Sequence, residues 1–87
     1  MNWPTLLQRI SEICTRDNLE LLTDISDPST VSIVDVKLAA HICRFTEHGE
    51  LMLLNYDNSI HLYRDTSFDD ILNFLDTQAY KNVVSGE

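Results

Sequence analysis

The stretch GELMLLNYDNSIHLYRD, residues 49–65, constrains the fold more than any other part of the chain. Two short apolar segments flank the turn formers at 57–59, which is typical of a β-hairpin. A second turn is expected at 47–49, where Gly49 supplies a positive φ. Because successive side chains of a strand point to opposite faces, Leu51–Leu54 places apolar groups on both sides of the hairpin. Each face of the resulting sheet therefore needs a cover.

The two ends of the chain have helical periodicity. The first helix is expected to begin after Asn2 as N-cap and to end at Asn18, which favours the left-handed capping conformation. A second helix is expected to start after Thr66 or Ser67, with an acidic residue three positions later as in a capping box, and to end near residues 80–82. The apolar stripes that predict the two helices are Trp3, Leu6, Leu7, Ile10, Ile13 and Cys14, and then Phe68, Ile71, Leu72, Leu75 and Ala79.

Between the helices, alternating patterns predict strands at 19–25, 50–56 and 60–64. Residues 31–45 are ambiguous, because they begin β-branched and continue with the helix-friendly residues Lys37 and Leu38; the hairpin that follows favours strand. The sequence thus predicts an α+β fold in one small domain over residues 1–82, with residues 83–87 as a flexible tail. Its order is helix, an antiparallel meander of three to four strands, helix (α-β-β-β-β-α).

The two helices can cover the sheet in two ways. Both helices can lie on one face and leave the other open, or one helix can lie on each face. We favour the first, which leaves an apolar patch of the kind that marks an interaction site. Register decides which alternate set of side chains is exposed. We expect Ile42, Met52, Leu54, Ile60 and Leu62 beneath the helices, and Phe45, Leu51, Leu53 and Tyr63 as exposed partner-binding anchors.

The charge of the chain limits the classes of partner that it can bind. Fourteen acidic residues against six basic ones give a formal charge of −8, which argues against direct binding to nucleic acid or anionic membranes. It favours steering to a basic protein. The chain has no apolar run long enough to span a membrane and no leader pattern, so we expect a cytoplasmic protein with its two cysteines reduced and buried.

No catalytic or metal-binding signature is present. His41 and His61 could face each other across the sheet near Asn55, and Cys43 lies two residues from His41, but neither pair has the spacing or third group of a metal or nucleophile site. The glycine-rich phosphate loops and hydrolase motifs are absent. We therefore expect a non-enzymatic protein without metal or cofactor.

The sequence predicts an acidic protein-interaction module, in the manner of a small inhibitor, adaptor or chaperone, that binds itself as a homodimer or another protein. Acids on the last helix and just before it, Asp65, Asp69, Asp70 and Asp76, would form the steering rim of the site. The alternative is an acidic nucleic-acid mimic that blocks a DNA- or RNA-binding protein. The element order resembles that of double-stranded-RNA-binding domains, but the basic helix start and glycine-rich loop of that family are missing.

Overall fold

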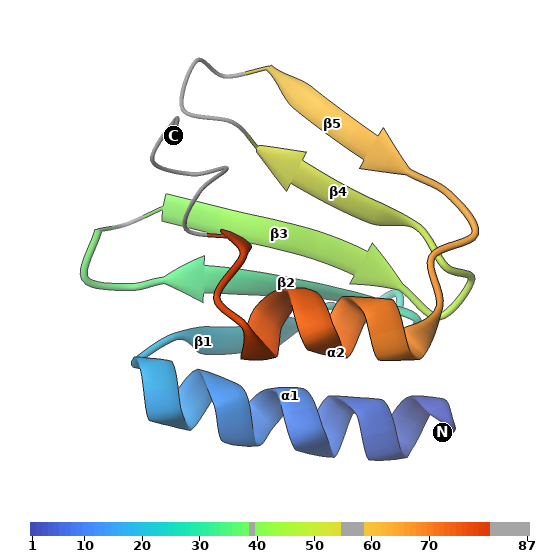
Figure 1. The fold of residues 1–87 in the computed structure, drawn as a ribbon, viewed down its shortest axis with the longest axis horizontal. Coiled ribbons are helices and arrows are strands. Elements are labelled where there is room, and N and C mark those ends of the chain that lie inside the picture. Colours follow the sequence, from blue (N-terminus) through green and yellow to red (C-terminus); the bar gives the residue numbers. More distant parts are fainter. Residues whose placement is uncertain (39, 55–58, 81–87) are drawn as a thin grey trace.

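The protein is an α+β domain with an N-terminal helix, an antiparallel meander and a C-terminal helix, as predicted (Figure 1). A computed structural model describes residues 1–38, 40–54 and 59–80. The sheet has five strands in the order β1-β2-β3-β4-β5. The elements are α1 (Trp3–Asp17), β1 (Glu20–Thr23), β2 (Thr30–Asp35), β3 (Ala40–Thr46), β4 (Leu51–Leu54), β5 (Ile60–Tyr63) and α2 (Phe68–Asp76).

The sheet has more strands than expected because residues 31–45 form two strands and not one. The strand interpretation of this region is confirmed, but a turn at residues 36–38 divides it into β2 and β3. The side chain of Asp35 accepts a hydrogen bond from the Leu38 N–H (3.1 Å) and so closes the turn. Lys37 and Leu38, which gave the region its helical character, lie in this turn.

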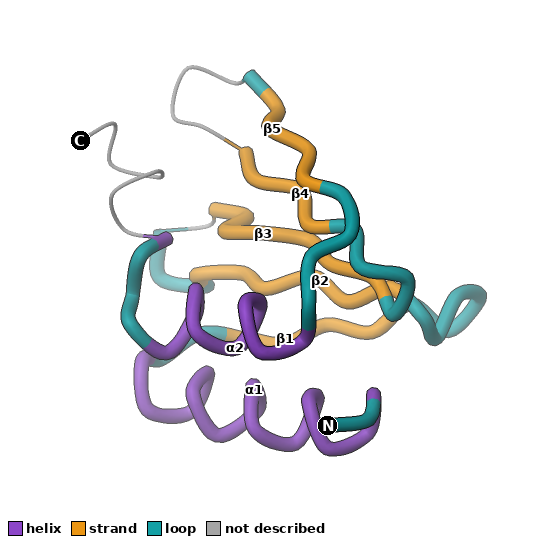
Figure 2. Tube along the Cα trace, turned by 45° about the vertical axis from the view of Figure 1, so that its right-hand side comes forward, coloured by secondary structure: helices purple, strands orange, loops and turns teal. Residues whose placement is uncertain are grey.

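Both helices lie side by side on the same face of the sheet (Figure 2). Their stripes meet the central strands in one core, and among the described residues no helix covers the opposite face. The prediction that both helices lie on one face of the sheet is therefore confirmed. The fully or nearly buried core side chains are Leu6, Ile10, Ile13, Cys14, Val31, Ile33, Ile42, Cys43, Phe45, Leu51, Leu53, Ile71, Leu75 and Tyr80.

The helix ends show how local chemistry sets the boundaries. Asn2 accepts a hydrogen bond from the Thr5 N–H (2.9 Å), and Asn18 adopts φ 59°, so both predicted caps of α1 are confirmed. Ser67 caps α2 by accepting from the Asp70 N–H (3.1 Å). The predicted end of α2 near residues 80–82 is wrong, because Gln78 adopts φ 61° and the helix stops at Asp76.

The turn between β3 and β4 depends on a glycine. Gly49 has φ 88°, and its carbonyl accepts the Thr66 N–H at 2.8 Å, which ties the turn to the segment before α2. A Cβ at this position would lie 3.1 Å from the Thr66 carbonyl oxygen. Of the predicted turn at residues 57–59, only residue 59 is described, and the predicted tail at 83–87 lies entirely outside the described residues. No helix in the described part of the chain is long and apolar enough to cross a membrane.

Candidate functional site

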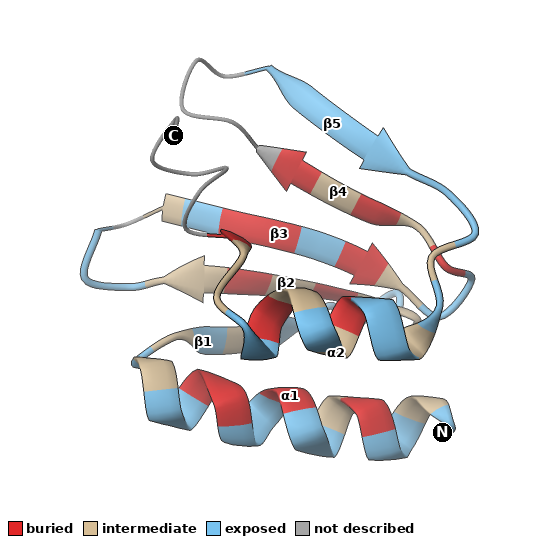
Figure 3. Cartoon of the chain, in the orientation of Figure 1, coloured by how far each residue is buried: buried red, intermediate tan, exposed pale blue. Residues whose placement is uncertain are grey.

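The face of the sheet away from the helices, here called the open face, carries a row of paired residues across all five strands. Strand register aligns Leu22, Ser32, Arg44, Met52 and Leu62 in this order from β1 to β5. Leu22 is 44% exposed and Leu62 39%, and Ile60, two residues before Leu62 and so on the same face, is 64% exposed. Figure 3 shows the contrast: β3 carries both buried and exposed residues, whereas β5 is exposed along its whole length. Large apolar groups thus stand in solvent at both ends of the row.

A shallow groove of about 250 Å³ crosses this face at the β1–β2 loop. Its apolar part is formed by Met52 and Leu62, and Arg44 stands beside them. Its acidic rim consists of Asp24, Asp27 and Glu50. Three carboxylates around one guanidinium give the groove a net negative character, with apolar contact area next to it.

Two carboxylates of the rim are held in fixed positions by their own turns. Asp24 accepts hydrogen bonds from the Ser26 hydroxyl (2.7 Å) and N–H (2.9 Å). Asp27 accepts from the hydroxyls of Ser29 (2.6 Å) and Thr30 (2.9 Å). These hydrogen bonds lower the pKa of both carboxyl groups, so Asp24 and Asp27 stay ionised at neutral pH. The sequence signal for this was the repeated Asp-x-Ser spacing in residues 24–29, typical of Asx turns, which our prediction of the site did not use.

Three predicted anchors are wrong. Phe45 (0% exposed), Leu51 (5%) and Leu53 (2%) belong to the core beneath the helices. The reason is register: Phe45 pairs with both Val31 and Leu51, and this whole set points at the helices. Of the set predicted to be inside, Met52, Ile60 and Leu62 lie on the open face and Ile42 is buried, while the side chain of Leu54 lies outside the described part of the structure.

The fourth anchor, Tyr63, lies on the helix side of β5, where the helices do not reach. It is 45% exposed and stacks on His61, with ring centroids 5.0 Å apart and planes at 10°. A second groove, of about 380 Å³, runs between this strand and α2. Its lining includes five of the eight predicted site residues: Leu51, Leu53, Tyr63, Asp65 and Asp70.

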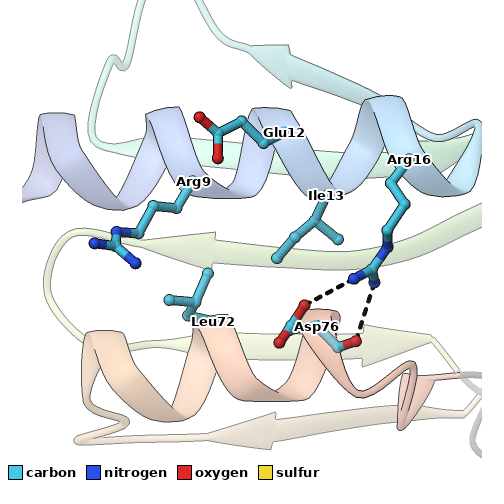
Figure 4. Close-up of a pocket in the computed structure, with 6 residues that line it drawn as sticks. All are labelled: Arg9, Glu12, Ile13, Arg16, Leu72 and Asp76. Atoms are coloured by element: carbon cyan, nitrogen blue, oxygen red, sulfur yellow. Dashed lines mark hydrogen bonds and ion pairs between the residues drawn. The ribbon is translucent and has the colours of Figure 1, made fainter.

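The predicted acidic stripe on the last helix is not continuous. Asp76 is bound by Arg16, whose guanidinium donates to the Asp76 side chain (2.8 Å) and main-chain carbonyl (3.0 Å), as Figure 4 shows. Arg16 also pairs with Asp17 (2.9 Å). Asp76 thus joins α1 to α2, and Asp69 and Asp70 lie in the first turn of α2, at the positive end of its dipole.

The structure keeps His41 apart from both residues with which a site was considered, His61 and Cys43. His41 lies on β3 and His61 on β5, with β4 between them, while Asn55 lies outside the described residues. A β-bulge beside Ile33 pairs Cys43 with Ile33 and His41 with Val34, so the buried Cys43 and the exposed His41 no longer share a face. Within the described ranges, no three His, Cys, Asp or Glu side chains form a group that could hold a metal ion.

Both thiols are free and buried. Burial raises the pKa of Cys14 to about 11 and that of Cys43 to about 12, so neither is a thiolate at neutral pH.

Comparisons of this chain with protein-family models, curated proteins and solved structures find no match.

Proposed function

We propose that the protein is a non-enzymatic interaction module that binds a basic protein partner through its open face. The observation that carries this proposal is the placement of both helices on one side of a five-stranded sheet, which leaves large apolar side chains in solvent on the other. A sheet normally buries each apolar face against another layer. A partner that lies on the open face supplies that missing layer.

Charge supports a basic partner. The chain carries a formal charge of −8, and the groove on the open face has three acids, two of them fixed in ionised form. Lysine or arginine side chains at the edge of the partner would meet this rim, while apolar groups at its centre would cover Met52 and Leu62. Such a charge pattern raises the association rate and selects the partner, and the apolar contact provides most of the affinity.

Arg44 adds a requirement on the partner. It stands in the middle of the open-face row, where it interacts electrostatically with Asp24 of the rim but forms no hydrogen bond with another described residue. A partner that covers the row would bury the N–H groups of this guanidinium and would have to bring a hydrogen-bond acceptor to them, because burying unsatisfied donors is costly. In this proposal the module acts in the cytoplasm, without a cofactor, as a small inhibitor, adaptor or chaperone-like protein.

The test compares two leucine substitutions that introduce the same charge in different places. Leu22→Glu alters the open face, and Leu38→Glu alters the β2–β3 turn, where Leu38 is 68% exposed. Immobilised wild type and both variants are used in parallel to capture proteins from cells that express the chain. We expect a basic protein that the wild type and Leu38→Glu retain in equal amount and that Leu22→Glu loses at least tenfold.

Equal retention by all three proteins would refute a role of the open face. Retention that survives Leu22→Glu but disappears at moderately raised salt would instead support the nucleic-acid mimic. An array of acidic residues binds by electrostatic attraction, which salt screens. Circular dichroism of both variants must match the wild type, which is expected because both leucines stand in solvent.

A further inference from the structure

The two edge strands of the sheet differ in their contact with the helices and in their charged residues. At β1, α1 packs against the strand, and Glu20 places a charge on it. β5 lies at the opposite edge, away from both helices (Figure 1), and all four of its residues are exposed. Its sequence, Ile60-His61-Leu62-Tyr63, contains no lysine, proline or acidic residue. Proteins usually protect an exposed edge with such residues, with a bulge or with a covering element.

We propose that β5 pairs with β5 of a second copy of this chain, antiparallel, to form a continuous ten-stranded sheet about a twofold axis perpendicular to it. Pairing at a strand edge satisfies the outward main-chain N–H and C=O groups, and a twofold arrangement closes the assembly at two copies. The proposal concerns the edge strand and does not depend on the function proposed for the open face.

The symmetry restricts the register. Directly opposite residues in an antiparallel pair lie on the same face, so the axis must pass midway between one residue of the strand and the same residue of the second copy. An axis at Leu62 places Leu62 opposite its copy on the open face and His61 opposite Tyr63 of the second copy on the helix side. This register gives two aromatic cross-strand pairs, whereas an axis at His61 would oppose two imidazoles. The geometry therefore favours the axis at Leu62.

Charge selects this edge over the open face as the self-contact. Arg44 stands at the centre of the open-face row, so two open faces packed about a twofold axis would bring two guanidiniums together. In the edge-paired dimer the two Arg44 positions are five strand spacings apart, about 24 Å at ~4.8 Å per spacing. That is about three Debye lengths at physiological salt, where the length is ~8 Å.

The paired edges also join two partly covered apolar patches. Ile60, Leu62 and the neighbouring Met52 of each copy would form one band across the new seam on the open face. Since the axis is perpendicular to the sheet, both open faces point the same way. Leu22, at the far edge of each copy, remains uncovered.

The mass in solution tests the proposal with a matched pair of variants. Leu62→Glu and Leu22→Glu change the same residue type in the same row, with similar exposure (39% and 44%), at opposite edges. Light scattering on a sizing column is run over a wide range of concentrations. We expect wild type and Leu22→Glu to approach twice the 10.0 kDa chain mass, and Leu62→Glu to remain at 10.0 kDa.

A covalent trap tests the register. Opposite residues of an antiparallel pair have Cα atoms roughly 4.5–5.5 Å apart, within the range for a disulfide. Leu62→Cys is expected to form a cross-linked dimer under mild oxidation, while Leu22→Cys stays uncross-linked. The buried native thiols of Cys14 and Cys43 give little background.

A wild type that stays monomeric at every concentration, with no excess of cross-link at position 62 over position 22, would overturn the proposal. A dimer that Leu22→Glu dissociates and Leu62→Glu does not would also overturn it, because the contact would then lie elsewhere.

Discussion

The assignment of the two sheet faces predicts opposite results for truncations at neighbouring positions of β4. Leu53 is 2% exposed and pairs with Cys43 on one side and His61 on the other, beneath the helices. Met52, the preceding residue, lies on the open face between Arg44 and Leu62. Replacing each in turn by alanine therefore removes a core side chain in one variant and a surface side chain in the other.

The magnitudes follow from burial. Leu53→Ala leaves a cavity in a packed core, which costs about 3–5 kcal/mol. Met52→Ala removes contacts on one side only and should cost about 1 kcal/mol or less, since complete burial of such a side chain is worth about 1.5–3 kcal/mol. At roughly 0.05–0.15 kcal/mol per residue, an 87-residue domain has about 4–13 kcal/mol in total. Leu53→Ala thus removes a large part of the stability.

Urea unfolding followed by circular dichroism measures the difference, at a protein concentration low enough that self-association does not contribute. With a slope of about 1–1.5 kcal/mol per molar urea, Leu53→Ala should lower the midpoint by 2 M or more, and Met52→Ala by less than about 1 M. An equal or larger loss for Met52→Ala would refute the face assignment and place the register one residue away.

Two further predictions concern single residues. Gly49→Ala should destabilise the protein by about 1–2 kcal/mol in the same urea assay, because φ 88° disfavours any side chain and the added Cβ would crowd the Thr66 carbonyl oxygen; a neutral result would contradict the turn geometry. The pKa of Asp17 is lowered in the folded protein, mainly by its hydrogen bond with Arg16. The ionised carboxylate therefore stabilises the fold at any pH above the unfolded pKa of about 3.9. This stabilisation is lost as the pH falls from that value through the lower pKa of the folded state. Asp17→Asn should therefore be less stable than the wild type at pH 7 and lose less stability between about pH 5 and pH 2, as thermal unfolding across that range would show; parallel pH profiles would contradict it.

Local signals in the sequence were sufficient for most of the fold. The apolar stripe and the two asparagine caps define α1, and Gly49 defines the β3–β4 turn, because each depends on residues close in sequence. The end of α2 was missed because glutamine is not a usual left-handed residue, yet Gln78 adopts φ 61° and donates a hydrogen bond to Asp17 (3.1 Å). A contact 61 residues away in the chain thus helps to set the end of this helix.

The candidate site was harder to predict because the strand sequence is ambiguous between faces. β4 reads Leu-Met-Leu-Leu, so either alternate set could form a core. Sequence reasoning identified the two sets but assigned them to the wrong sides, and only the packing of the helices on Leu51 and Leu53 distinguishes them. The bulge in β3 likewise cannot be predicted from the alternation of apolar residues, although it places Cys43 and His41 on different faces.

The exposure of β5 follows from the number of elements in each layer. Five strands place β1 and β5 about 19 Å apart, at ~4.8 Å per spacing, whereas two packed helices have axes only about 8–10 Å apart. The two-residue link after Asp17 keeps α1 beside β1, and the hydrogen bond from Thr66 to Gly49 directs the chain back across the sheet before α2 begins. The helical layer is therefore displaced toward β1, and the last strand extends beyond it. No other element in the described part of the chain covers this edge, and its strand, which contains no acidic residue, lysine or arginine, is the part of this acidic chain that we propose to meet its own copy.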